Sequence, residues 1–367
     1  MRVSLARILA AFSVSLAFSA PAQAEEEKVL NIYNWSDYVA EDTIEKFTAE
    51  TGIKVNYDVY DSDEVLSAKL QAGRSGYDVV FPSNAFLAQQ VKMGVYQKLD
   101  RSKLKNYGNL DPKVLKTLAE AADPGNAHAI PYMIAATGIG YNIDKVKAVF
   151  PDAPLDSWAL LFKPEVVAKL KSCGVSLLDT PTEVFPAALS YLGKNGASQS
   201  SEDMKEAAKV VSAVRPSIRY FHSSKYINDL ANGDVCVSHG HVGDLVQARD
   251  RANEADRGVR INVIIPKEGA ELNIDSAAIP ADAPHPGNAH LFLDFLMRPD
   301  IIADITNVTG YANAIPAAMA FTDPEIAEDV AIYPPEDVRA KEFLLPPATQ
   351  AFERERTRTW TRVKTGK

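Results

Sequence analysis

The sequence predicts an α/β protein with two lobes joined by at least two strands, and three observations lead to this prediction. Strand-like and helical segments alternate between residues 28 and 93, which is typical of a largely parallel sheet covered by helices on both faces. The roughly 340 residues that follow the first 24 exceed what one hydrophobic core usually holds. From about Arg260 the pattern again resembles that of the first segment, so we expect the chain to cross into a second lobe and return.

The individual elements follow from the spacing of apolar residues. Alternating or clustered apolar residues predict strands at 28–33, 55–59, 77–82, 129–142, 175–178, 234–238, 260–266 and 273–279. Helical spacing predicts helices at 43–52, 62–72, 85–93, 184–192, 202–214, 224–232, 244–255 and 289–297. The long extended segment is the expected crossing between the lobes. The predicted boundaries are 25–132 plus 256–319 for the first lobe and 133–255 plus 320–367 for the second.

Residues 1–24 have the features of a secretory signal peptide. A short basic start with Arg2 and Arg7 precedes an apolar run, and small residues at 22–24 form a cleavage site. The apolar run at 8–18 is shorter than the roughly 20 residues that span a bilayer. We therefore expect a soluble mature protein in a bacterial periplasm.

The charge of the chain limits its partners. The formal net charge is −9, and no basic stripe is visible in the sequence. An acidic protein of this kind is a poor candidate for binding nucleic acid or an anionic membrane, but it suits a cationic ligand.

Cys173 and Cys236 are the only cysteines. In an exported protein an isolated pair is most simply a disulfide, which would disfavour the unfolded chain by about 4 kcal/mol. Two free buried thiols are the alternative, and the distance between the residues decides between them.

The segment from Asn34 to Tyr38 is chemically suited to gripping an organic ammonium group. It places Trp35 and Tyr38 beside Ser36 and Asp37, directly after the first predicted strand. Aromatic rings offer a negative face to a cation and a carboxylate offers a full charge. The alternative is that both rings are half-buried packing residues and the acid a turn residue.

Carboxylates at the ends of predicted strands extend this pattern. Asp37, Glu183, Asp244 and Asp275 each lie where a strand gives way to a loop. Any single one is more often a cap or turn residue, but four from both lobes indicate a negatively charged cleft. Open α/β sheets bind ligands in the crevice beyond their strand ends.

Catalytic and metal-binding functions find little support in the sequence. The nucleophile elbow, the phosphate-binding loop and the zinc-protease motif are absent, and Gly138-Ile139-Gly140 is only a fragment of a dinucleotide fingerprint. No enzymatic activity and no cofactor are therefore expected. His239, His241 and Asp244 form a metal-like pattern, with both imidazoles expected on one face of a strand. We favour the alternative, in which the acid caps the next helix and the histidines line a polar crevice.

Several linked motifs resemble the putrescine- and spermidine-binding periplasmic proteins of ABC polyamine importers. They are VLNIYNWSDY (29–38), GYDVVFPSN (76–84), IPY (130–132) with GIGYN (138–142), and FHSSKYI (221–227) with LANG (230–233). The resemblance covers essentially the whole mature chain. It implies a type II periplasmic binding fold, in which two lobes with mixed five-stranded sheets flanked by helices close on a ligand about a hinge. It also implies a bridge between Cys173 and Cys236.

The resemblance implies a ligand-binding set and a transport partner. Matched position by position, the ligand-contacting residues are Trp35, Ser36, Asp37, Tyr38, Ser83, Glu183, His241, Asp244, Asn273, Asp275 and Tyr311. A diamine carries a charge at each end at neutral pH, so separated carboxylates can bind its ends while aromatic faces cover the methylenes. The implied protein is a monomer that delivers its ligand to a membrane permease driven by an ATPase.

Three positions depart from the family pattern. Relatives usually have aromatic residues where this chain has His241 and Asn273, and many have Trp at the position of Ile134. These exchanges weaken the apolar sleeve around an alkyl chain, and the first two add hydrogen-bonding groups. The sequence therefore leaves two ligand classes open, a simple polyamine such as putrescine or spermidine, and a more polar amine such as agmatine, γ-glutamylputrescine or a cationic amino-acid derivative.

Overall fold

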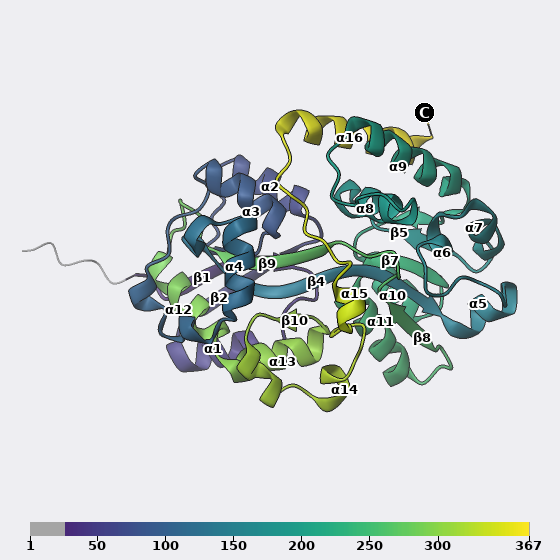
Figure 1. Ribbon diagram of the computed structural model, residues 1–367. Helices are drawn as coiled ribbons and strands as arrows, with labels where there is room; N and C mark the ends of the chain where they lie inside the picture. Colours follow the sequence, from purple (N-terminus) through teal and green to yellow (C-terminus); the bar gives the residue numbers. More distant parts are fainter. Residues whose placement is uncertain (1–25, 367) are drawn as a thin grey trace, which may run out of the picture.

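Two sheets share one long strand at the centre of the molecule. The computed structural model describes residues 26–366, so the expected signal peptide at 1–24 lies outside the described residues. The strands are β1 (Val29–Trp35), β2 (Lys54–Tyr60), β3 (Val79–Val80), β4 (Ala129–Asn142), β5 (Val175–Leu177), β6 (Tyr220–Phe221), β7 (Val237–His241), β8 (Ile261–Ile264), β9 (Leu272–Ala278) and β10 (Ala312–Asn313). Figure 1 shows β4 and β9 running across the middle, from one group of helices to the other.

Helices surround both sheets. They are α1 (Thr43–Thr51), α2 (Asp63–Gln71), α3 (Asn84–Lys92), α4 (Pro112–Ala121), α5 (Ile143–Val149), α6 (Ala159–Phe162), α7 (Pro164–Leu170), α8 (Pro181–Tyr191), α9 (Ser201–Val214), α10 (Lys225–Ala231), α11 (Val242–Ala255), α12 (Pro286–Leu296), α13 (Pro299–Thr309), α14 (Pro324–Ala327), α15 (Glu336–Arg339) and α16 (Gln350–Thr365). α6 and α7 are separate helices, because Pro164 has no N–H to continue the first and instead begins the second.

The crossing strand predicted at 129–142 is confirmed as β4, and its two halves belong to different sheets. Residues 129–136 pair antiparallel with β9, and residues 137–142 pair antiparallel with β7 and β8. The pairs β3–β9 and β4–β10 are also antiparallel, whereas β1–β2, β1–β3, β5–β6 and β5–β7 are parallel. Each sheet is therefore mixed, with the order β2-β1-β3-β9-β4 on one side and β4-β7-β5-β6 on the other.

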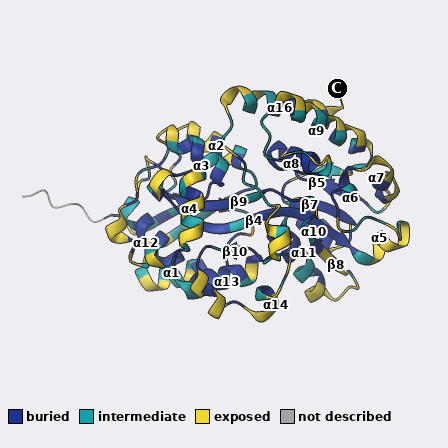
Figure 2. Cartoon of the chain, in the orientation of Figure 1, coloured by how far each residue is buried: buried dark blue, intermediate teal, exposed yellow. Residues whose placement is uncertain are grey.

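Each sheet has its own hydrophobic core. In the first sheet, the adjacent residues Val79 and Val80 of β3 belong to apolar clusters on opposite faces, as expected for a strand covered by helices on both sides. The second sheet packs into one larger cluster that includes Trp158, Leu245 and Trp360. Figure 2 shows the strands buried and the outer turns of the helices exposed.

The return of the chain to the first sheet comes later than the sequence predicts. Residues from 256 onward were assigned to the first lobe, yet Ile261 and Val263 of β8 pack in the core of the second sheet. The reason is that β8 pairs with the second half of β4, and only the next strand, β9, pairs with its first half. An apolar strand pattern is the same in either sheet, so the sequence does not distinguish the two partners.

Cys173 and Cys236 form a disulfide, with their Cα atoms 5.4 Å apart. The bond ties the end of the α7 segment to the residue before β7, within the second core. Across residues 26–366, no helix combines the length and apolar character needed to cross a membrane.

Candidate ligand-binding site

Residues of both sheets line one cavity. The first sheet and its connections contribute Trp35, Ser36, Tyr38, Tyr60, Asp61, Asp63, Ser83, Ala135, Asn273, Asp275 and Tyr311. The second contributes Glu183, Ser223, Ser224, Ile227, His241 and Asp244. Most of these residues lie at the carboxyl ends of strands or in the first turn of the following helix, which is where open α/β sheets place their ligands.

Ten of the eleven residues predicted to contact a ligand line this cavity, and Asp37 is the exception. Sequence reasoning missed Tyr60, Asp61, Ser223 and Ser224, among others. The first two lie at the end of β2, a strand the sequence did predict, so the rule that ligands bind beyond strand ends would have found them. The two serines follow β6, which is only two residues long and has no readable pattern.

Aromatic rings form an ordered wall of the cavity. The rings of Trp35 and Tyr60 lie 4.7 Å apart, and both side chains donate hydrogen bonds to the carbonyl of Phe81, at 2.8 and 2.6 Å. On the other side, the rings of Tyr38 and Tyr311 meet edge to face at 4.7 Å. Fixed rings of this kind can cover an alkyl chain or a cation without further ordering.

Asp275 is a buried acid on β9. The hydroxyl of Tyr38 donates a hydrogen bond to its Oδ2 atom at 2.6 Å. Burial raises the pKa of Asp275 to about 6, while the Tyr38 hydrogen bond and the charge of His241 oppose the rise. At neutral pH the carboxylate is therefore ionised and only partly compensated, which makes it a strong site for a cation.

Asp244 is held by two tyrosines. The hydroxyls of Tyr226 and Tyr311 donate to its two carboxylate oxygens at 2.6 and 2.7 Å. Asp244 lies in the first turn of α11 but makes no side-chain cap, and His241 occupies the N-cap position. The cap expected for this acid is therefore wrong, because both of its oxygens are used by side chains on neighbouring elements.

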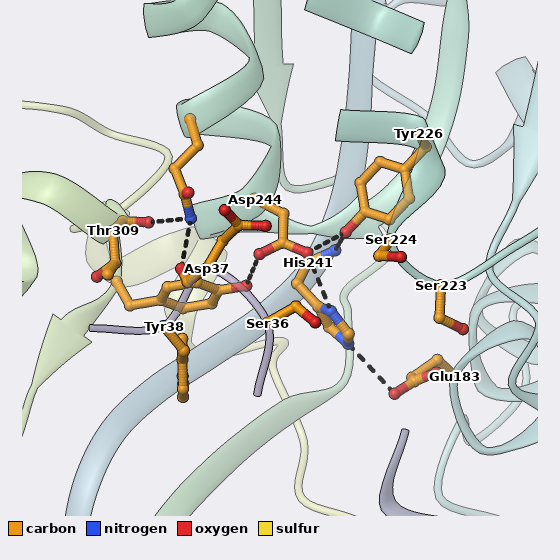
Figure 3. Close-up of polar contacts among 12 residues, drawn as sticks. Ser36, Asp37, Tyr38, Glu183, Ser223, Ser224, Tyr226, His241, Asp244 and Thr309 are labelled. Carbon is orange, nitrogen blue, oxygen red and sulfur yellow. Dashed lines mark hydrogen bonds and ion pairs between the residues drawn. The ribbon is translucent and has the colours of Figure 1, made fainter. Parts of the chain in front are cut away.

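His241 lies between two acids, as Figure 3 shows. Its Nε2 atom is 3.2 Å from Oε1 of Glu183, and its Nδ1 atom is 3.8 Å from Oδ2 of Asp244. Burial lowers the pKa of the imidazole, but the hydrogen bonds and charges of these two acids outweigh burial and raise the pKa well above 6.5. The protein thus carries its own cation inside the cavity.

His239 does not join this cluster, so the metal-like pattern is wrong, and of the polar crevice expected to be lined by both histidines only the His241 part is found. Its ring is fully buried in the second core, 5.3 Å from the ring of Trp158, and burial lowers its pKa to about 3. The two histidines are separated because β7 ends at His241, where the backbone turns into α11. In the described part of the chain no three His, Cys, Asp or Glu residues are grouped to hold a metal ion.

Asp37 lies outside the cavity and joins the two halves of the molecule instead. Its Oδ1 atom accepts a hydrogen bond from Arg251 of α11 at 2.8 Å, and its carbonyl accepts one from Gln247 at 3.2 Å. The backbone of Asp37 is left-handed, with φ of 53°. This turn directs the side chain toward α11 and away from Ser36 and Tyr38, which do line the cavity.

Two buried acids keep an unpartnered oxygen. Within residues 26–366, Oε2 of Glu183 and Oε2 of Glu271 have no hydrogen-bond partner, although Asn273 donates to the other oxygen of Glu271 at 3.2 Å. Burial raises the pKa of Glu271 well above its usual range. Ile134, the third position that departs from the family pattern, lines a separate hollow beside β10.

Comparison with known proteins identifies the family. Residues 42–334 match the family described as bacterial extracellular solute-binding protein. The chain belongs to this family. The match covers most of the described residues, from α1 to the segment after α14, and begins after β1 and after the cavity residues Trp35, Ser36 and Tyr38.

Characterised relatives of this solute-binding protein span nearly its whole length. It is 54% identical to the putrescine-binding periplasmic protein of Pseudomonas aeruginosa strain UCBPP-PA14, over 98% of both chains. It is also 54% identical to the putrescine-binding periplasmic protein of Escherichia coli K12, over 96% of this chain and 95% of the other. A putrescine/agmatine-binding protein of Pseudomonas aeruginosa is 42% identical over 92% of both chains.

Solved structures share the fold. A lipoprotein of Treponema pallidum superposes with a TM-score of 0.76 at 28% identity, over 92% of this chain and 99% of the other. The spermidine/putrescine ABC transporter substrate-binding protein of Streptococcus pneumoniae superposes with a TM-score of 0.74 at 24% identity, with the same coverage. The expected type II periplasmic binding fold, with two mixed sheets flanked by helices, is confirmed.

Proposed function

We propose that the protein is the periplasmic substrate-binding component of an ABC importer and that it binds an amine of the polyamine class between its lobes. In this proposal it works as a monomer and delivers the amine to a membrane permease driven by an ATPase. Similarity over nearly the whole chain to two putrescine-binding periplasmic proteins supports the ligand class.

The observation that carries the proposal is the pairing of buried acids with aromatic walls in one enclosed cavity. Asp275 offers an ionised carboxylate, and Trp35, Tyr60 and Tyr38 surround the space beside it. A desolvated ammonium over an aromatic face gains about 2 kcal/mol, and a buried carboxylate adds to this. A few such contacts are enough for micromolar binding, which corresponds to about 8 kcal/mol.

The site assignment is part of the proposal. We assign ligand contact to the ten predicted residues that line the cavity, and we withdraw it from Asp37. We also propose that each sheet belongs to one lobe and that the two lobes move relative to each other. In this proposal β4 and β9 are the strands that cross between the lobes. The segment after residue 320 returns to the second lobe.

A panel of amines tests the proposal. The mature protein is heated with putrescine, cadaverine, spermidine, spermine, agmatine or γ-glutamylputrescine, because a ligand that binds only the folded state raises the melting temperature. At least one amine is expected to shift the melting temperature, and isothermal titration then gives its affinity. If no amine in the panel produces a shift, the proposal is wrong.

Two observations favour a second candidate within the same class, a receptor for a more polar amine. His241 and Asn273 both line the cavity, where they replace apolar ring surface with hydrogen-bonding groups. The same panel separates the two candidates, since γ-glutamylputrescine and agmatine carry polar groups that putrescine lacks.

A further inference from the structure

The charges inside the cavity are distributed unevenly between its two walls. On the second-sheet wall, His241 contacts both Glu183 and Asp244, at 3.2 and 3.8 Å. His241 is the only basic side chain among the described residues that line the cavity. Its raised pKa keeps it protonated at neutral pH, so a cation that belongs to the protein already offsets one of the two negative charges on this wall.

The first-sheet wall has no such cation. The carboxylate of Asp275 accepts a hydrogen bond from the neutral Tyr38 hydroxyl, and the charge of His241 acts on it without a direct ion pair. The rings of Trp35 and Tyr60 line the cavity on the same wall. A ligand ammonium gains the most on this wall, because the carboxylate is buried and, within residues 26–366, forms no ion pair with a basic side chain.

A second ammonium on the opposite wall would meet the imidazolium of His241. Like charges at close range repel strongly in a space shielded from water. A diamine therefore loses at one end part of what it gains at the other.

The second-sheet wall also offers hydrogen-bonding groups that are not engaged by His241. Oε2 of Glu183 is buried and has no partner in the described part of the chain, so it can accept a ligand N–H. The hydroxyls of Ser223 and Ser224 line the same wall, and Ser223 accepts a hydrogen bond from the N–H of Asp179 at 3.3 Å, which leaves its own proton free to donate. Figure 3 shows both serines on the side of His241 where Glu183 lies. One acceptor beside hydroxyl donors is the complement of an amide group.

We infer that the cavity is built for an amine with one positive charge and a neutral amide at its other end, that is, a mono-N-acylated diamine. The inference rests on the proposed function, since it names the ligand class of the same site. The ammonium lies at Asp275, and the amide N–H and C=O lie at Glu183 and the serine hydroxyls.

Isothermal titration at pH 7.5 with N-acetylputrescine and putrescine tests the inference on the wild-type protein. We expect N-acetylputrescine to bind at least tenfold more tightly. If both bind and putrescine is as tight or tighter, the inference is wrong and the proposed function stands. If neither these two nor any amine of the panel binds, the proposed function itself is wrong.

His241→Phe tests the origin of the preference, because it keeps a flat ring and removes the charge. We expect the variant to bind putrescine at least tenfold more tightly than wild type does, and to lose the preference for the acylated amine. His239→Gln is the matched control, since it changes a neutral histidine of the same strand that lies outside the cavity, and the wild-type affinity ratio should persist. An unchanged ratio in folded His241→Phe would overturn the role assigned to His241.

Discussion

The guanidinium of Arg251 donates a hydrogen bond to the carboxylate of Asp37 at 2.8 Å, and this pair joins α11 of the second lobe to the turn after β1 of the first. The two residues lie 214 positions apart in the chain. Neither side chain lines the cavity. The pair therefore stabilises the contact between the two lobes and does not contact the ligand.

Arg251→Ala should weaken amine binding by about two- to fivefold, because a partly exposed ion pair contributes at most about 1 kcal/mol. The order of preference among amines should not change, since the cavity wall is intact. Isothermal titration measures both quantities. Arg298→Ala is the matched control, because Arg298 pairs with Glu50 at 2.9 Å with similar exposure and remote from the cavity. Equal effects of the two substitutions would contradict a role of Arg251 in closure.

Asp275→Asn should lower the affinity for the cognate amine by about 30-fold or more, because truncating one partner of a buried charge pair costs about 2–5 kcal/mol. Asp61→Asn is a useful comparison, since Asp61 lines the same cavity but is only partly buried. Asp61→Asn should lower the affinity for the cognate amine much less than Asp275→Asn does. Wild-type affinity in Asp275→Asn would refute the place assigned to the ammonium.

The walls of the cavity were predictable because local rules place them. Trp35, Ser83 and Asp244 each follow a strand, and the carboxyl ends of the strands in each sheet meet at one edge, so their convergence needs no knowledge of distant residues. The role of β4 as the crossing strand was equally predictable from the sequence, because an extended run of fourteen residues is too long for one lobe alone.

Other features depend on contacts that the sequence does not encode locally. Asp37 leaves the cavity because of one left-handed backbone angle and a partner far along the chain. His239 lies in the core and His241 in the cavity, because β7 runs from the core to the cavity and ends at His241. The periodicity of a strand does not show where the strand ends. The charge of His241 arises only when the β7–α11 turn and α8 bring two acids to one ring.

The pH dependence of the cavity follows from the buried carboxyl of Asp275. Burial raises its pKa to about 6 from 3.8, so the folded protein holds this proton more tightly than the unfolded chain does. Its contribution to the stability of the ligand-free protein is therefore full below about pH 4 and is lost as the pH rises through 6, by roughly 3 kcal/mol in total. Amine binding has the opposite trend, because an ammonium needs the ionised carboxylate.

We expect the affinity for the cognate amine to fall as the pH drops below 6, and the melting temperature of the ligand-free protein to change in the opposite sense over this range. Titration calorimetry and thermal denaturation between pH 5 and 8 measure both trends. Asp275→Asn should flatten both curves. If Asp275→Asn keeps the wild-type pH profile, the pH dependence of affinity and stability comes from Glu183 and Asp244, the other acids that face Asp275.

Removal of the disulfide separates stability from ligand choice. Cys173 and Cys236 close a loop of 63 residues in the second core and do not line the cavity. Replacing both with alanine should lower the free energy of unfolding by about 4 kcal/mol, because the unfolded chain regains the freedom that the bond removes. The ratio of affinities for N-acetylputrescine and putrescine should stay at its wild-type value, since Glu183, His241 and Asp244 are placed by α8 and α11.

Urea denaturation with and without reductant measures the effect on stability. Reduced wild type serves as the control for the cavities that alanine leaves behind, because it retains both sulfur atoms. A reduced wild type with the same unfolding midpoint as the oxidised protein would show that the second core holds without the bond. A changed affinity ratio would show that the bond also positions the wall that carries His241, since Cys236 directly precedes the strand that ends at this residue.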